Sequence, residues 1–287
     1  MSNEKEDIEL RKEQIKQALI QAGSIDEACG LILGNTFKKR CFFSPFADQT
    51  IRKAYAEDYN KYFAHRLSSY KSTLENFLTQ TTFLHNMGNV VDLGCGSGLF
   101  LGLLSRAIGE DKKIGLYGID FSEEMLGYAR YNLKHMGVRN VVLIKGDIAK
   151  LKGLCISFNL KPKYLFSLNV LHQIKNPKKF IKDALDVLEP NGQIFIETII
   201  RDSDWNKKRQ RLIHLVDVNL DLFIARFKGH LSALTKNEIK LMLDDLGVIK
   251  YKMFVSERTG YYDETLTIII TKEAIPNKEL NHGTNRL

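Results

Sequence analysis

Apolar and polar residues follow two different patterns along the chain. In the first 87 residues, apolar side chains recur at helical spacing, as between Ile8 and Ile20, and no strand pattern occurs. Ser24 and Glu27 are spaced as a capping box, which predicts the start of a second helix. The pattern from Asp48 to about Leu84 predicts one or two long helices. We therefore predict a helical N-terminal cap over residues 1–87.

From Asn89 onward, short apolar segments alternate with helical ones, which is typical of a parallel sheet covered by helices. The predicted strands are Val90 to Leu93, Ile114 to Ile119, Val141 to Ile144, Tyr164 to Leu168 and Gln193 to Ile200. The helices predicted between them are Leu99 to Ile108, Ser122 to Met136 and Pro177 to Leu188. This alternation predicts an α/β core over residues 88–273.

A further helical pattern, residues 204–230, interrupts the alternation before the end of the core. It begins with basic residues, becomes apolar after Arg211, and is predicted to be a helical lid insertion. Such an amphipathic segment could cover an apolar acceptor, bind a partner, lie on a membrane surface or simply pack as a helix. A helix at Leu234 to Leu246 follows, and then two strands, Val248 to Val255 and Thr265 to Thr271, which could form an antiparallel hairpin at the sheet edge. Residues 274–287 are predicted to be a polar tail.

Composition excludes several classes of protein. The 287 residues are 44% hydrophobic and 26% charged with 5 prolines, as in an ordinary globular protein. The charged N-terminus does not resemble a secretory signal, and no apolar run approaches the ~20 residues that span a bilayer. The 4 cysteines are widely spaced and form no C-x-x-C pair, so neither a disulfide framework nor a metal site is predicted. We expect a cytoplasmic protein with reduced thiols.

Positive charge is concentrated in one part of the chain. Lys and Arg number 42 against 34 Asp and Glu, a net charge of +8. Nine lysines lie between Lys145 and Lys182, opposed there only by Asp147. Two interpretations stay open, a solvated basic face and a surface for an anionic partner such as nucleic acid.

The most informative segment is VVDLGCGSG, between the first strand and the first helix of the core. Gly94, Gly96 and Gly98 allow a tight turn and a close approach to a ligand, while the helix that follows offers unpaired N–H groups. The dinucleotide fingerprint requires a small residue where the chain has Leu99, and the phosphate loop of nucleoside triphosphatases requires a closing Lys-Ser/Thr pair. NAD and ATP are therefore both disfavoured.

An acidic residue two positions before a G-x-G-x-G loop resembles the first motif of class I S-adenosylmethionine-dependent methyltransferases. The resemblance continues in order across Asn89 to Lys272 with YGIDFSEEML, IKGDIAKL, YLFSLNVLHQI and FIKDALDVLEPNGQIFIET. It is greatest to the group that includes ubiquinone and menaquinone biosynthesis methyltransferases, most of which act on small molecules. It implies S-adenosylmethionine as cofactor and a doubly wound, mostly parallel seven-stranded sheet.

The resemblance also implies roles for residues after the second and third strands. Asp120 would accept hydrogen bonds from both ribose hydroxyls, a geometry that suits a carboxylate. Phe121 and Met125 would pack on the adenine faces, although core packing explains each of them nearly as well. Asp147, followed by Ile148, would receive the adenine amino group.

Three further residues complete the predicted site. Asp92 is expected to order the glycine loop near the amino acid end of the cofactor, and Asn169 to end the fourth strand at the mouth of the sheet. Many nucleic-acid amino-methyltransferases carry N/D-P-P-Y/F where this chain has NVLH, which disfavours base methylation. His172 is the candidate general base, since a near-neutral pKa suits proton transfer; a structural histidine is the alternative.

Three functions remain open from the sequence. The main hypothesis is methyl transfer to an apolar or aromatic small molecule, covered by an apolar roof that includes Phe37, Phe42, Phe43 and Phe46. An RNA methyltransferase fits the net charge, although no RNA-binding module is recognisable. A regulatory protein that binds the cofactor without catalysis is the third.

Overall fold

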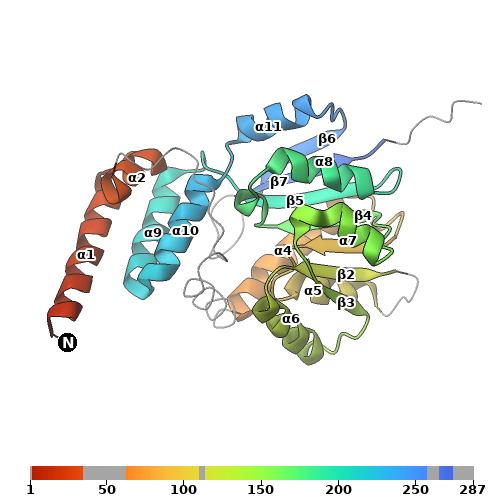
Figure 1. Ribbon diagram of the computed structural model, residues 1–287, viewed down its shortest axis with the longest axis horizontal. Helices are drawn as coiled ribbons and strands as arrows, with labels where there is room; N and C mark the ends of the chain where they lie inside the picture. Colours follow the sequence, from red (N-terminus) through yellow and green to blue (C-terminus); the bar gives the residue numbers. More distant parts are fainter. Residues whose placement is uncertain (1, 35–62, 110–113, 257–264, 274–287) are drawn as a thin grey trace, which may run out of the picture.

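A computed structural model describes residues 2–34, 63–109, 114–256 and 265–273 of the chain. Its centre is a seven-stranded sheet in the order β3-β2-β1-β4-β5-β7-β6 (Figure 1). The strands are β1 (Val90–Leu93), β2 (Leu116–Asp120), β3 (Val141–Lys145), β4 (Tyr164–Leu168), β5 (Gln193–Ile199), β6 (Tyr251–Ser256) and β7 (Thr265–Thr271). The first five strands are parallel, and β7 runs antiparallel to both β5 and β6. The predicted doubly wound, mostly parallel fold is therefore confirmed, including the terminal hairpin.

Helices cover both faces of the sheet. One face packs against α4 (Phe63–Gln80), α5 (Leu99–Ile108) and α6 (Glu123–His135). The other face packs against α7 (Leu151–Ser157), α8 (Pro177–Val187) and α11 (Lys236–Asp245). The sequence had not predicted α7, which follows a single 3-10 turn, η1 (Ile148–Lys150), and is only 7 residues long. A segment this short carries two inward-facing residues, too few to establish a helical period.

Aromatic side chains fix α4 on the sheet. The ring of Phe77 meets those of Phe100, Phe166 and Phe195 edge-on, at centroid distances of 5.6, 6.0 and 5.7 Å. All four side chains are fully buried, and burial of each such side chain contributes about 1.5–3 kcal/mol. This contact attaches the last helix of the N-terminal region to the core.

The remaining helices form a separate helical unit at one end of the molecule (Figure 1, left). It consists of α1 (Ser2–Gln21), α2 (Ile25–Leu33), α9 (Trp205–Val218) and α10 (Leu220–Ser232). These helices share an apolar core that includes Leu19, Ala28, Val216 and Phe223, all fully buried. The N-terminal region is thus divided, since α1 and α2 join the insertion while α4 joins the sheet.

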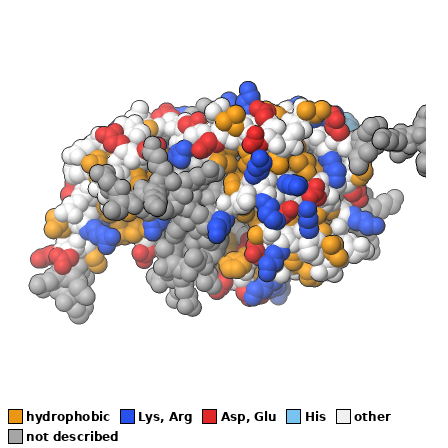
Figure 2. Space-filling view, turned by 45° about the horizontal axis from the view of Figure 1, so that its top comes forward, with side chains coloured by type: hydrophobic (Ala, Val, Ile, Leu, Met, Phe, Trp, Pro, Cys, Tyr) orange, Lys and Arg blue, Asp and Glu red, His pale blue; other side chains and the backbone are white. Residues whose placement is uncertain are grey.

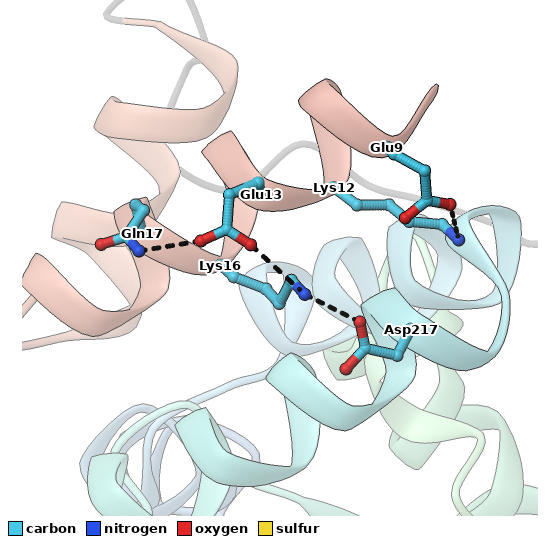
Figure 3. A network of polar contacts seen from close by, with 6 residues as sticks. All are labelled: Glu9, Lys12, Glu13, Lys16, Gln17 and Asp217. Carbon is cyan, nitrogen blue, oxygen red and sulfur yellow. Dashed lines mark hydrogen bonds and ion pairs between the residues drawn. The ribbon is translucent and has the colours of Figure 1, made fainter. Parts of the chain in front are cut away.

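Polar contacts accompany this packing between α1 and α9. Lys16 Nζ lies 2.9 Å from Asp217 Oδ1 and 3.4 Å from Glu13 Oε2, and Gln17 Nε2 donates to Glu13 Oε1 (Figure 3). The side chains of Glu13 and Asp217 are more than half exposed, and exposed ion pairs contribute little to stability. The apolar seam is therefore what holds α1 against α9.

Two local predictions are refined by the structure. The segment 204–230 is two helices rather than one, because Asn219 has an extended backbone and its side chain accepts a hydrogen bond from the N–H of Leu222. At the start of α2, the hydroxyl of Ser24 caps the N–H of Glu27 as predicted, but Glu27 Oε2 accepts from the N–H of Gly23 instead of Ser24. No helix within the described ranges is long and apolar enough to cross a membrane.

Candidate active site

The glycine loop joins β1 to α5 with three left-handed glycines. Gly94, Gly96 and Gly98 have φ of 77°, 54° and 72°, a region that L side chains rarely adopt. A Cβ added at Gly94 would lie 2.5 Å from Val170 Cγ2, and one at Gly98 would lie 3.0 Å from Ala129 Cβ on α6. Both the backbone angles and the close neighbours therefore require glycine here.

A pocket of about 730 Å³ opens beside this loop, at the carboxyl ends of β1 to β4. That volume lies within the range of small-molecule sites. Eight of the ten predicted cofactor residues line it: Gly94, Gly96, Asp120, Phe121, Met125, Asp147, Ile148 and Asn169. Asp92 and Gly98 do not. Gly98 instead allows α5 to approach α6, and Asp92 lies beneath the loop on β1.

Asp120 is held rigidly at the end of β2. Its Oδ2 accepts a hydrogen bond from the N–H of Gly96 and its Oδ1 one from the N–H of Ser122, both at 2.8 Å. Burial raises the pKa of Asp120, while the backbone hydrogen bonds from Ser122, Gly96 and Phe121 oppose that shift. A carboxylate has about four acceptor sites, so the group can still accept a hydrogen bond from the ribose.

The other end of the pocket suits a flat, partly apolar ring. Phe121 is 55% exposed although it is a large apolar side chain, and Met125 is buried close by on α6. Asp147 caps the 3-10 turn η1, since its Oδ1 accepts from the N–H of Ala149 at 2.9 Å. A carboxylate beside an exposed aromatic face can bind adenine through its amino group and its ring.

Asn169 directly follows β4 and has a left-handed conformation with φ of 54°. Its N–H donates to the carbonyl of Glu197 on β5 at 2.7 Å, and its own carbonyl accepts from Gln173 Nε2 at 3.0 Å. These contacts fix the backbone, whereas its side-chain Oδ1 is buried and has no hydrogen-bond partner in the described structure. Asn169 thus offers an unused acceptor atom at the wall of the pocket.

His172 lies outside this pocket. It lines a second cavity of about 490 Å³ with residues of α8 and α11, and its carbonyl accepts from Ser232 Oγ at 2.8 Å. Burial lowers the pKa of His172 to about 3, with smaller contributions from His230 and Arg226. A ring this weakly basic and turned away from the glycine loop is suited to packing against α10. The general-base role stays a prediction that this placement disfavours.

The partly buried His172, whose Nδ1 is shielded from solvent, makes stability depend on pH. Its folded pKa of about 3 lies below the ordinary 6.5, so the unfolded chain takes up a proton that the folded protein refuses as pH falls below 6.5. We expect the free energy of unfolding to drop by about 2 kcal/mol between pH 7 and 5 from this group alone. Urea unfolding of wild type and of His172→Gln at both pH values measures this drop in the free energy of unfolding. Equal losses in the two proteins would contradict the expectation.

Sequence reasoning missed part of the pocket wall. Eight lining residues follow Asn169, in or beside the turn η2 (Leu171–Gln173) and in α8: Val170, Gln173, Ile174, Lys175, Asn176, Lys179, Phe180 and Asp183. The available signal was their position after a strand whose carboxyl end meets the ligand. The predicted roof of Phe37, Phe42, Phe43 and Phe46 lies outside the described residues.

Two lysines of the lysine-rich stretch, Lys175 and Lys179, line this pocket, and part of the charge of the stretch is neutralised by ion pairs. Figure 2 shows Lys and Arg side chains interspersed with Asp and Glu over the half of the molecule that holds the sheet. Lys152 and Lys179 pair with Asp183, Lys152 also with Asp186, and Lys178 with Asp245. Within the described ranges, no cluster of His, Cys, Asp or Glu could hold a metal ion.

The residues present fit S-adenosylmethionine. The glycine loop leaves no room for side chains, and the Asp120 carboxylate is held in place with an acceptor site to spare. The buried Oδ1 atoms of Asp92 and Asn169 have no hydrogen-bond partners within the described ranges. The residues after β3 can hold adenine, Asp120 at the end of β2 can accept from the ribose, and the glycine loop follows β1, so these groups lie in the order of the strands. That sequence of groups matches the order of chemical groups along the cofactor.

Comparison with known proteins gives two family matches. The model of a methyltransferase domain matches residues 84–246, and that of protein-L-isoaspartate(D-aspartate) O-methyltransferase matches residues 6–151. An uncharacterised protein of Methanocaldococcus jannaschii is 29% identical over 67% of this chain and 78% of its own length. A demethylmenaquinone methyltransferase of Geobacillus stearothermophilus is 32% identical over 30% of this chain, a match that spans 40% of that enzyme.

Solved structures share the fold. The plantazolicin methyltransferase BpumL, in complex with a pentazolic desmethylPZN analog and SAH, is 18% identical with a TM-score of 0.60. The match covers 94% of this chain and 99% of that one. The likeness therefore extends beyond the sheet to most of the chain.

Proposed function

Because this chain belongs to the methyltransferase-domain family and is a class I S-adenosylmethionine-dependent methyltransferase, we propose that it methylates an oxygen, carbon or nitrogen nucleophile of a small organic molecule. The observation that carries the proposal is the single pocket in which the glycine loop, Asp120, Asp147 and Asn169 meet. The cofactor supplies there a methyl group made electrophilic by its sulfonium. The protein's task is to align an acceptor with that group and to exclude water.

The proposed cofactor contacts follow the strand order. Asp147 and Ile148, after β3, and Phe121 and Met125, after β2, would hold adenine. Asp120 would accept the ribose hydroxyls, and Gly94 and Gly96 would let the chain approach through the loop after β1. Gly98 would support the loop from behind, and Asp92 would lie under the loop, near the amino acid end of the cofactor. The reactive end would then face Asn169, at the end of β4.

The acceptor is proposed to be apolar or aromatic and to lie beyond Asn169. The demethylmenaquinone relative and BpumL act, by their names, on a demethylated quinone and on an azole-containing compound, which supports a compact organic acceptor. The helical unit reaches this end of the sheet, since α10 contacts η2. No described residue of α9 or α10 lines the cofactor pocket, so the lid role of residues 204–230 remains a hypothesis about the acceptor side alone.

A nucleic-acid acceptor is the second candidate. The exposed Lys175 on the pocket wall favours it, because lysines bind phosphates. The ion pairs of Lys152, Lys178 and Lys179 reduce the free charge of the same surface. A steep loss of RNA binding with added salt would support this candidate.

The enzyme is proposed to work in a reducing compartment, as expected of the cytoplasm. Cys29, Cys95 and Cys155 are buried and are not joined to one another by disulfide bonds. Burial raises the pKa of the Cys95 thiol well above its ordinary value, with smaller contributions from Asp92 and Asp120. These thiols would therefore be inert packing groups rather than nucleophiles.

Calorimetric titration with S-adenosylhomocysteine, with NAD as the control ligand, tests the proposed function. We expect micromolar binding of the homocysteine compound and none of NAD. Methyl transfer from labelled S-adenosylmethionine is then measured on phenols, quinone precursors and bulk tRNA. A folded protein that binds no S-adenosylhomocysteine would contradict the proposal, and methylation of tRNA alone would favour the second candidate.

A further inference from the structure

The carboxyl group of Asp92 is buried at the end of β1, directly before the glycine loop. The residue is 2% exposed, and its Oδ1 has no hydrogen-bond partner in the described structure. An isolated carboxylate is costly to bury, so such groups are normally paired, hydrogen-bonded or protonated. No hydrogen bond to Oδ1 offsets the free-energy cost of burying the Asp92 carboxylate.

The surroundings of Asp92 contain acidic and apolar groups. Asp120, on the neighbouring strand β2, and the Cys95 thiol in the loop are the titratable groups that interact with it. On the other side, β4 pairs Phe166 with Asp92, and α5 contributes apolar Leu99 and Phe100 to the same cluster. Tyr70 of α4 belongs to that cluster too, and Glu197 lies one strand further away, on β5. Burial and Asp120 together raise the pKa of Asp92 well above its ordinary value.

The strand order identifies the ligand group that would meet Asp92. With adenine at the end of β3 and ribose at Asp120 on β2, the next part of the cofactor lies over β1. That part is the amino acid end, which carries an ammonium and a carboxylate. An ammonium within about 4–6 Å of a carboxyl favours its charged form.

We propose, on the basis of the proposed function, that Asp92 is a proton-linked binding residue: it is protonated before the cofactor binds and releases that proton to solvent when the ammonium group arrives. The carboxylate formed then pairs with the ammonium through charge. Each protein molecule that binds the cofactor therefore releases one proton to the buffer. Cofactor affinity consequently falls as pH drops through the range in which free Asp92 takes up its proton, by up to about tenfold per pH unit.

Proton release on ligand binding measures this coupling without any methyl acceptor. S-adenosylhomocysteine is titrated into the full chain in buffers of different ionisation enthalpy, over a series of pH values. We expect up to one proton released per ligand at the acidic end of the series. Methylthioadenosine has the same adenosine and thioether but no amino acid end, so we expect it to bind without proton release.

Two variants assign the proton to one residue. Asp92→Asn keeps the shape and removes the titration, so we expect it to bind S-adenosylhomocysteine with no proton release. Asp147→Asn, the matched control, changes an exposed carboxylate in the same pocket and is expected to release protons like wild type. Equal proton release by wild type and Asp92→Asn, or by the two ligands, would overturn the inference.

The failure of this inference is distinguishable from the failure of the function. Tight binding of S-adenosylhomocysteine with no proton release at any pH would overturn only the role of Asp92. Absence of binding to the folded wild type would overturn both. Should Asp92→Asn fail to fold, the wild-type series decides, because affinity independent of pH would also overturn the proton linkage.

Discussion

Gly94→Ala is expected to weaken binding of S-adenosylhomocysteine by at least about 100-fold, equivalent to about 3 kcal/mol. Alanine at φ of 77° is strained by roughly 1–2 kcal/mol. The added Cβ would also lie 2.5 Å from Val170 Cγ2, so either the loop or Val170 must move. Both line the pocket, and either movement changes the site. Calorimetry of the purified variant measures the loss.

A matched control separates crowding from backbone strain. Gly137 has nearly the same φ, 72°, but a Cβ there would meet nothing within 4 Å. We therefore expect Gly137→Ala to lower stability without lowering affinity. The double variant Gly94→Ala/Val170→Ala removes the crowding atom and is expected to recover part of the binding. Full affinity of Gly94→Ala alone would show that the loop does not face the ligand.

The core of the fold was predictable because its strands are short, apolar and bounded by turn residues. Val90–Leu93 and Tyr164–Leu168 have the bounds that the pattern predicts. Asn219 shows where the same reasoning fails: apolar residues continue on both sides of it, so the periodicity does not reveal that its side chain caps a new helix. The antiparallel direction of β7 was predicted because β6 and β7 follow one another closely enough to form a hairpin, and not from the residues of β7 itself.

The cofactor end of the site was predictable from local sequence, and the wall opposite was not. Asp120 is the last residue of β2 and Asp147 lies two residues after β3, and the carboxyl ends of parallel strands meet at one edge of a sheet. His172 lies three residues beyond Asn169, where the 3-10 turn η2 determines which way each side chain points. That turn directs Gln173 to the cofactor pocket and His172 to the second cavity. The spacing alone cannot distinguish these two directions.

Asp120→Asn is expected to reduce affinity for S-adenosylhomocysteine by about 100-fold. The carboxylate accepts backbone N–H groups from Gly96 and Ser122, and an asparagine must turn its own N–H₂ toward one of these donors. The change also weakens hydrogen bonding from the ribose, and a bond to a charged group contributes about 1.5–3 kcal/mol. Because burial raises the pKa of Asp120, its charge is unfavourable in the fold, and the neutral asparagine is not expected to unfold the protein.

Ligand fragments locate the loss within the cofactor. Adenine lacks the ribose, so we expect it to bind Asp120→Asn and wild type equally, while adenosine distinguishes the two. Asp147→Asn should show the reverse pattern and weaken adenine and adenosine alike, by about tenfold, the equivalent of one hydrogen bond. If Asp120→Asn lost adenine as well as adenosine, its defect would lie in the glycine loop that Gly96 anchors. If it lost neither, the ribose would be held elsewhere, and the assignment of the ribose to the end of β2 would be wrong.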